Sequence, residues 1–380
     1  MDTEIRPTQT SRLAGTLDES KGRYFDFARS ALRKRDVQRM LVNIAIILGL
    51  GLYVQLQNGL FFTTRNIEAI SVQIVVVTIL ACAMTLVMIA GHIDLSVSGT
   101  VVLSGMVAGL CIQRGIPIWL SFVIATLSGI GVGLVNSFLI LVVGITSFIA
   151  TIGTLYASQG VSALFTNGQP IFNLPLSFNT IGQGQIIGSI PYALPMIVLV
   201  VALFVAIQRY MALGRHAAAT GSNPQAAFLN GVNVKRTTTL CFVLSGAAAG
   251  WGGVVYASRL GNPAPTLDND LLFQVIVAIV IGGTSLFGGE GTVFGTFLGS
   301  VLVGVLNNSL NLLGISTFWQ YICLGILLTA SVGMDTVLRR DSVRRFRRSL
   351  VQSRRDRAID RSESTQRSGL SDRPRGGDAD

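Results

Sequence analysis

Charged residues are scarce in this chain, making up 13% of its 380 residues, whereas 50% of the residues are hydrophobic. A soluble globular domain typically carries about 25% charged residues. The shortage excludes a water-covered surface over most of the chain. The mean hydropathy is +0.59, and 42 residues are glycine. This composition is typical of packed transmembrane helices.

Cysteine, histidine and catalytic motifs are also in short supply. The four cysteines, Cys82, Cys111, Cys241 and Cys323, each stand alone in an apolar run, without C-x-x-C spacing or a histidine cluster. The chain has no Walker-type phosphate loop, no H-E-x-x-H and no nucleophile elbow. We therefore expect no catalytic residue, metal or cofactor in this chain. Any energy source must be a gradient or another subunit.

Basic residues are concentrated at the two ends. Of the 29 Lys and Arg residues, nine lie in residues 1–40 and thirteen follow Asp335, which leaves seven for the stretch between. A net charge of +10 can indicate nucleic-acid binding, but basic tails beside a membrane give the same count. We expect a basic tail at 1–39, a membrane domain at 40–336, a disordered Arg-rich tail at 337–380 near anionic lipid, and no nucleic-acid partner.

Long apolar runs recur through the membrane domain. A helix needs about 20 apolar residues to cross the hydrocarbon core of a bilayer. Ten runs approach or reach this length, at 40–57, 67–90, 95–112, 118–141, 146–165, 191–208, 238–258, 271–287, 293–312 and 318–336. The sequence predicts an all-α integral membrane fold of about ten transmembrane helices.

The basic residues also indicate sidedness, because cytoplasmic loops are enriched in Lys and Arg. With ten spans and a cytoplasmic N-terminus, 26 of the 29 basic residues lie inside and only Arg65, Arg114 and Arg259 lie outside. An odd number of spans would leave one basic tail on the wrong face. We expect a multi-pass membrane protein with both termini in the cytoplasm.

Two loops differ from simple connectors. The segment 166–190 carries no charge and should form a compact cap on the outer side. The internal loop 209–237 contains Asn223 followed by Pro224, a helix-start signal, and Gly231, a helix-stop signal. A short helix over about Asn223–Leu229 is predicted there.

A faint internal repeat accompanies these elements. Residues 89–101 align without gaps with residues 281–293, with five identities at an offset of 192. Both segments are Gly-rich helix junctions, and a common bend in unrelated helices would look similar. If the repeat is real, it predicts two discontinuous helices near the centre of the protein, as transporter repeats often have.

Asp94 is the one carboxylate between Thr78 and Val135. An ionisable group beside a membrane span is expensive and by default functional, yet Asp94 or Ser96 could equally cap the following helix. His92 and Asp94 could also relay protons. Polar residues within the spans suit either a wet path for a neutral hydroxylated solute or hydrogen bonds between helices. The candidate pathway set is His92, Asp94, Ser96, Asn136, Gln159, Asn307, Asn308 and Asn311.

These motifs resemble a known family. The run GHIDLSVSG at 91–99 is similar to the GGIDLSVGS signature of permease subunits in ribose/xylose-type ABC sugar importers. Further similar stretches follow in the same order: FIATIG at 148–153, TNGQP at 166–170, IGGTSL at 281–286 and LNNSLNLLGISTFWQY at 306–321. The likeness extends from about residue 65 to residue 336.

The resemblance implies a mechanism and partners. A second permease copy would complete the pathway, an extracytoplasmic binding protein would deliver a monosaccharide such as xylose or ribose, and a separate cytoplasmic ATPase would use ATP and Mg. The loop 209–237 would dock on that ATPase, with the small alanines allowing close approach and Phe228 or Leu229 as anchor. The coupling residues would be Gly214, Arg215, Gly221, Asn223, Pro224, Ala226, Ala227, Phe228, Leu229 and Gly231.

The chain also departs from the family pattern. His92 stands where the signature has its second glycine, and Leu272-Phe273-Gln274 stands where the family commonly has Glu-Leu-Asp. The identity of the sugar therefore does not follow from the resemblance, since specificity in such importers lies largely with the binding protein. Two other functions compete with the importer: a stand-alone proton-coupled transporter using His92 and Asp94, and a membrane scaffold that transports nothing.

Overall fold

The computed structural model describes residues 37–186, 190–265, 270–330 and 332–333. Of these residues, 37–186, 190–265 and 270–328 belong to one compact unit, and those from Thr329 belong to a second. The helices described below, apart from the last residues of Thr317–Ala330, belong to the first unit. Nearly all of the basic tail expected at 1–39 and the whole Arg-rich tail expected at 337–380 lie outside the described residues.

Within the described ranges the regular structure is helical. Seven helices are long and apolar enough to cross a membrane, and three apolar helices are shorter. The seven are Val37–Asn58, α2 (Thr64–Ile89), α4 with its π-helical end η1 (Ile118–Val143), α5 (Ser147–Thr166), α7 (Ala193–Tyr210), α10 (Val234–Leu260) and α12 (Val293–Leu312). The three are α3 (Val97–Gln113), α11 (Asp270–Ile281) and Thr317–Ala330.

Each of the ten helices falls on one of the ten predicted apolar runs, so the expected integral membrane fold is confirmed. The predicted bounds are wrong mainly for 271–287, because α11 ends at Ile281. Three further short helices lie in the loops: α6 (Leu176–Gln183), α8 (Ala212–Ser222) and α9 (Pro224–Leu229).

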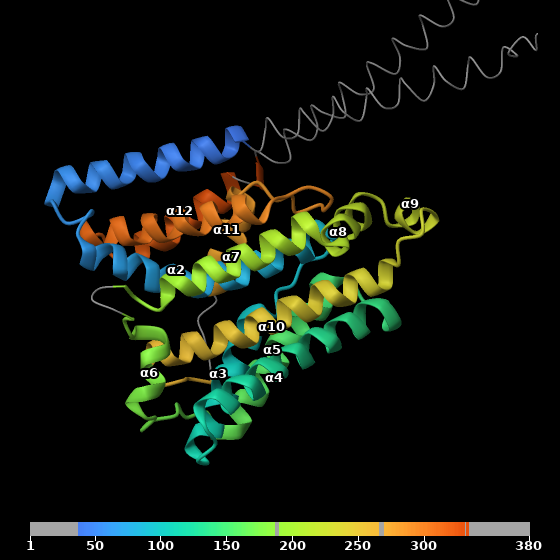
Figure 1. Ribbon diagram of the computed structural model, residues 1–380, viewed down its shortest axis with the longest axis horizontal. Helices are drawn as coiled ribbons and strands as arrows, with labels where there is room; N and C mark the ends of the chain where they lie inside the picture. Colours follow the sequence, from blue (N-terminus) through green and yellow to red (C-terminus); the bar gives the residue numbers. More distant parts are fainter. Residues whose placement is uncertain (1–36, 187–189, 266–269, 331, 334–380) are drawn as a thin grey trace, which may run out of the picture. The chain divides into compact units, whose positions relative to one another are not determined.

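Helices α2 and α10 form the centre of the bundle (Figure 1). Every residue of α2 from Ile74 to Ile89 is buried, which is why this helix is apolar on all sides instead of on one face. Helix α10 packs against α2, α3 and α4. The two central helices therefore determine which side chains face each other inside the protein.

Glycines allow α4 and α10 to approach closely. A Cβ atom on Gly129 would meet the carbonyl oxygen of Gly246, and its distance to the Gly250 Cα would be only 2.9 Å. The Gly-x-x-x-Gly spacings of both helices thus serve backbone packing, as their pattern predicts. Any larger side chain at these positions would separate the helices.

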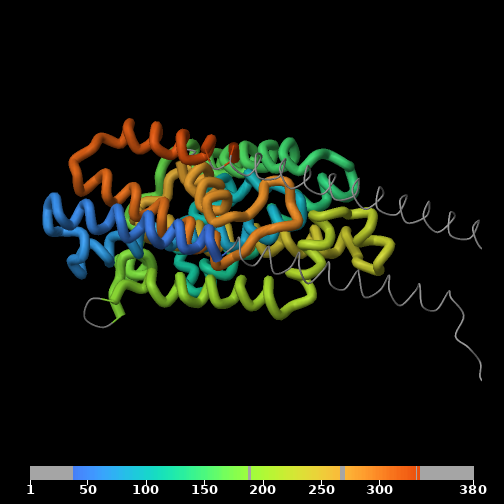
Figure 2. The backbone as a smooth tube through the Cα atoms, turned by 90° about the horizontal axis from the view of Figure 1, so that it is seen from above, coloured from blue at the N-terminus to red at the C-terminus, as the bar shows by residue number. Residues whose placement is uncertain are grey.

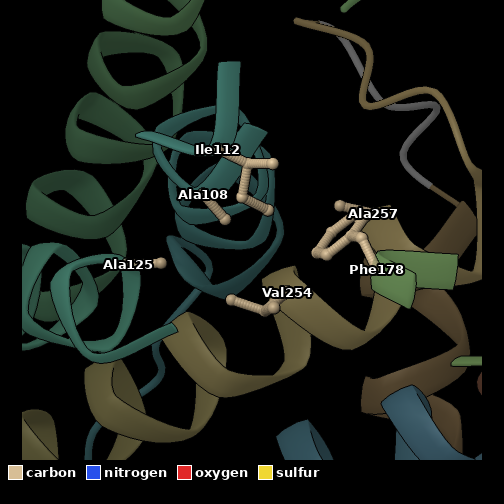
Figure 3. Packing of buried hydrophobic residues seen from close by; sticks show 6 residues of the cluster. All are labelled: Ala108, Ile112, Ala125, Phe178, Val254 and Ala257. Atoms are coloured by element: carbon tan, nitrogen blue, oxygen red, sulfur yellow. The ribbon is translucent and has the colours of Figure 1, made fainter. Parts of the chain in front are cut away.

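The segment 166–190 contains the short helix α6, seated on one end of the bundle. Its Phe178 is fully buried, and the Ser258 hydroxyl donates a hydrogen bond to the Phe178 carbonyl at 2.6 Å. Figure 3 shows Phe178 next to Ala257 of α10, in a cluster to which α3 and α4 also contribute; its members are Ala108, Ile112, Ala125, Phe178, Val254 and Ala257. The expected cap is therefore a packed helix within the described part of the segment.

Helices α8 and α9 lie at the opposite end of α10 from α6. Figure 1 shows α9 at one end of the helix bundle and α6 at the other, and Figure 2 shows the same chain from above. The 27 residues of α10 separate the two ends by about 40 Å at 1.5 Å per residue. The two predicted loops thus occupy opposite ends of the membrane domain.

Candidate functional site

Two helices, α2 and α11, end next to each other at the end of the bundle that carries α8 and α9. An irregular segment separates each of them from the helix that follows, and we call α2 and α11 the interrupted helices. Helix α2 stops at Ile89 and α11 stops at Ile281, positions that are 192 residues apart. Each helix end has the two backbone hydrogen bonds of a Schellman motif, and the bonded residues of the two ends are again 192 positions apart. Gly91 and Gly283 occupy the left-handed position of the motif, with φ of 85° and 92°. The predicted repeat corresponds to two helix ends of one local structure. They lie at the α8–α9 end of the bundle and not near its centre, where the repeat predicted them.

The segments that follow these ends, 90–96 and 282–292, are in direct backbone contact. The Gly289 N–H donates a hydrogen bond to the Ile89 carbonyl at 2.8 Å. Gly221, in the last turn of α8, lies against both segments. A Cβ atom there would meet the Ile89 carbonyl oxygen and would lie 2.7 Å from the Gly289 nitrogen and 3.0 Å from the Ala90 carbonyl carbon. We call this contact of Ile89, Ala90, Gly221 and Gly289 the glycine junction.

Asp94, in the first of these segments, is the centre of a buried hydrogen-bond network. Its Oδ1 accepts from the Ser96 N–H at 3.0 Å and from the Ser96 hydroxyl at 2.5 Å, and its Oδ2 accepts from the Ser245 hydroxyl at 2.7 Å. The Asn136 amide donates to Ser96 Oγ at 2.8 Å and accepts from the Thr154 hydroxyl at 2.6 Å. One chain of bonds therefore connects α10, the start of α3, α4 and α5.

This geometry bears on both interpretations of Asp94. The carboxylate accepts the N–H two residues ahead of it, and the Ser96 side chain makes no capping bond of its own to α3. Asp94 therefore satisfies a backbone N–H at the start of α3. It also connects this helix start to Ser245 of α10, 151 residues further along the chain. Whether it also contacts a passing solute stays a prediction.

His92 is separate from this network. Its ring lies beside Phe242 of α10, with ring centroids 5.9 Å apart. Among the described residues no hydrogen bond joins this ring to Asp94, whose two oxygens are occupied by serine groups. A His92–Asp94 proton relay has no direct link in this arrangement.

The internal loop 209–237 contains two helices, α8 and α9, and not the single short helix expected. Helix α9 has the predicted start and stop: Asn223 Oδ1 accepts the Ala226 N–H at 3.0 Å, Pro224 is its first residue, and Gly231 follows it with φ of 82°. Gly214 of α8 is buried, and a Cβ atom there would meet the Gln208 carbonyl oxygen of α7. Close packing thus fixes α8 to the bundle while α9 extends from it.

The outer face of α9 is apolar and open. Phe228 is 70% exposed and Leu229 is 78% exposed. Ala226 and Arg215 are exposed too, whereas Ala227 is buried against the protein itself. Of the two alanines expected to permit close docking, only Ala226 is therefore available to a partner.

The remaining pathway candidates lie elsewhere. Asn308 of α12 exchanges two hydrogen bonds with Asn66 of α2, at 2.8 and 3.1 Å. Exposed Asn311 accepts a bond from Gln320 at 2.6 Å, and Asn307 is buried with no hydrogen-bond partner for its Oδ1 among the described residues. Gln159 is half-buried on α5. The structure therefore brings Ser96 and Asn136 to Asp94 but not Gln159 or the asparagines of α12.

Sequence reasoning missed a cavity of about 490 Å³ near the α6 end of α10. It is lined by α2, α3, α10 and α11, and its polar lining comes from Gln73, Tyr256, Arg259, Asp270 and Gln274. These residues are spread over 202 positions, so no local motif marks them. The available signal was the cost of placing Arg259 and Asp270 at the ends of apolar helices and Gln73 and Gln274 within them.

Comparisons with known proteins agree with this architecture. The family model of the branched-chain amino acid transport system / permease component matches residues 66–332. The chain belongs to this family. The ribose import permease protein of Haemophilus influenzae is 33% identical over 320 residues, which cover 83% of this chain and 96% of that protein. A comparison with solved structures finds no match.

Other relatives in this permease family are similar to the same degree. The ribose import permease protein of Bacillus subtilis is 34% identical over 285 residues, 74% of this chain and 88% of that protein. The D-allose transport system permease protein of Escherichia coli is 32% identical over 280 residues, 73% of this chain and 85% of that protein. The resemblance to monosaccharide permeases, based on motifs, is confirmed. The chain is a permease component and not itself an enzyme.

Proposed function

We propose that this chain is the membrane-spanning subunit of an ATP-driven importer that carries a monosaccharide across the inner membrane of a bacterium. The observation that carries the proposal is the pairing of the family match with helix α9. This helix is capped at its start, exposes Phe228 and Leu229, and follows directly on the α8 turn that contacts both interrupted helices. A chain with no catalytic motif thus has a surface through which a separate ATPase can act on it.

The substrate class follows from the relatives. The family description names branched-chain amino acids, but the relatives cited above are named for ribose and allose. Their similarity extends over most of both chains. A monosaccharide is therefore the favoured cargo, and D-ribose is the first pentose to test.

The glycine junction supports a route for coupling. When the ATPase subunit binds ATP with Mg and closes, α9 would move with it, and α8 would follow because Ser222 and Asn223 connect the two helices directly. Gly221 contacts the segment after α2 and the segment after α11. A displacement of α8 would therefore reach both interrupted helices at once and alter access between the two sides of the membrane.

The complex would contain three further components. A second permease copy would complete the pathway, an extracytoplasmic sugar-binding protein would dock on the α6 side, and the ATPase would bind α9. Lipid would cover exposed apolar residues of the outer helices such as Trp119 and Val198, which are 69% and 67% exposed. The proton-coupled alternative gains no support from the separate placement of His92 and Asp94.

Reconstitution tests the proposal directly. Proteoliposomes containing this chain, its ATPase and the sugar-binding protein should accumulate labelled D-ribose only when ATP and Mg are on the ATPase side. A control without the ATPase should accumulate none, with or without a pH gradient. Ribose uptake by the permease alone, driven by the pH gradient, would overturn the importer assignment.

A further inference from the structure

We propose that the cavity between α2, α3, α10 and α11 is the site that holds the monosaccharide during its passage. The inference rests on the proposed function and adds to it a place and a set of contacts. The cavity measures about 490 Å³, within the range of about 300–1,000 Å³ that is usual for small-molecule sites. It is formed by the central helices of the bundle and by α3 and α11, which adjoin the two interruptions.

The polar lining suits a neutral solute with several hydroxyl groups. Gln73 comes from α2, Tyr256 and Arg259 from α10, and Asp270 and Gln274 from α11. Amide, carboxylate, guanidinium and phenol groups together offer both donors and acceptors, which each hydroxyl of a sugar requires. One cationic and one anionic side chain balance the charge of the lining.

Arg259 is held in place by the protein itself. Its Nη1 donates to the backbone carbonyls of Val72 and Gln73 at 3.3 and 3.4 Å. A guanidinium group has five N–H donors in a fixed plane, so the backbone contacts orient the group at the cavity wall. A charged group at this position inside a membrane domain is costly, and such groups commonly mark a solute pathway.

The rest of the wall is apolar and closely packed. Val76 and Val77 of α2 and Val101 and Val102 of α3 give the cavity flat aliphatic faces, which suit the C–H faces of a sugar ring. Towards α9, α3 and α10 come into backbone contact, where a Cβ atom on Gly253 would lie 2.5 Å from the Val101 carbonyl oxygen. The cavity therefore ends at this contact on the α9 side.

The position matches what delivery from a binding protein requires. The cavity is lined by residues 253–260 of α10, within its last eight residues, whereas α9 precedes the first residue of α10. Between the cavity and α9 lies the Ser245–Asp94 hydrogen bond. A sugar entering from the α6 side would reach the cavity first and would pass the interrupted helices only when the glycine junction moves.

The test uses the complete complex in proteoliposomes and measures labelled D-ribose taken up per ATP hydrolysed. We expect Gln73→Leu and Gln274→Leu each to lower this ratio about fivefold, the effect of one lost neutral hydrogen bond. ATP hydrolysis stimulated by the ribose-loaded binding protein should stay within about twofold of wild type, because neither residue lies in the coupling loop. Gln57→Leu is the matched control, since Gln57 is exposed on the helix Val37–Asn58 and should behave as wild type.

A second variant guards against misfolding of the first two. Ala264 lines the cavity from a loop, so Ala264→Trp should fill the space and abolish uptake. Asn262→Trp, at an exposed position of the same loop outside the lining, should not. Unchanged uptake per ATP in Gln73→Leu, Gln274→Leu and Ala264→Trp would overturn the cavity assignment while leaving the importer intact. Uptake of L-leucine in place of D-ribose by the wild-type complex would instead overturn the proposed sugar cargo.

Discussion

Asp94 accepts hydrogen bonds on both oxygens from groups that are themselves buried, so removing it leaves several polar groups without partners. Each buried unsatisfied group costs about 1–3 kcal/mol. We expect Asp94→Leu to lower the thermal unfolding midpoint of the purified complex by several degrees. Asp94→Asn should be milder, because an amide can still accept from Ser96 and can donate to Ser245. Fluorescence-monitored thermal unfolding measures the difference.

Transport assays on the same two variants separate a structural role from a chemical one. If Asp94 only holds α3 to α10, ribose uptake by Asp94→Asn should stay near wild type while Asp94→Leu loses it. Equal loss of uptake in both variants, with Asp94→Asn as stable as wild type, would show that the negative charge itself is used.

At the residue scale, the sequence predicts features that depend on near neighbours in the chain, but not contacts between residues far apart in it. The start and stop of α9 were readable because Asn223, Pro224 and Gly231 act on neighbours within a few residues. The partnership of Asp94 with Ser245 spans 151 residues and depends on how α3 packs against α10. The cavity residues were not predicted for the same reason. Gln73 and Gln274 line one cavity only after α2 and α11 have packed together.

At the scale of elements, α9 presents two large apolar side chains on a helix of six residues. Buried anchor residues at the centre of an interface commonly contribute about 2 kcal/mol or more to binding. We therefore expect Phe228→Ala together with Leu229→Ala to weaken association of the ATPase at least tenfold, measured as co-purification from detergent. Val198→Ala, at a 67% exposed position on α7, is the control and should leave association unchanged. Full retention of the ATPase by the α9 variant would rule out this helix as the docking site.

The glycine junction gives a second prediction for an element, the last turn of α8. Gly221→Ala would push its Cβ atom into the Ile89 carbonyl and the Gly289 nitrogen, so α8 must shift away from both interrupted helices. We expect ribose uptake per ATP to fall at least tenfold while the complex still assembles. Gly160→Ala on α5 is the matched control, because no atom lies within 4 Å of a Cβ atom there. Wild-type coupling in Gly221→Ala would show that the junction transmits nothing.

Helix existence was predictable at this scale, whereas helix ends were less so. Apolar runs of 17–24 residues are a strong local signal, and all ten predicted runs contain a helix. The end of α11 at Ile281 was missed because the apolar pattern continues to Phe287, although the chain turns at Gly283. The internal repeat could have predicted this end, because Gly91, which matches Gly283, is the turn residue that follows the end of α2 at Ile89.

For the whole molecule, the charge distribution predicts which end of the bundle faces the cytoplasm. Helix Val37–Asn58 begins near the α9 end, where Arg39 donates a hydrogen bond to the Gly283 carbonyl at 3.0 Å. The basic residues Arg209, Arg215, Lys235 and Arg236 belong to that end as well. By the excess of basic residues in cytoplasmic loops, the α9 end should lie inside and the α6 end outside.

Labelling of single cysteines tests this orientation in intact membranes. In a variant whose four native cysteines are replaced by serine, Leu229→Cys on α9 and Leu176→Cys on α6 each provide one exposed thiol, at positions 78% and 82% exposed. A membrane-impermeant maleimide added to right-side-out vesicles should label Leu176→Cys, and in inverted vesicles it should label Leu229→Cys. The reverse pattern would place α9 outside, away from any cytoplasmic ATPase. The importer mechanism therefore depends on this result as much as on transport itself.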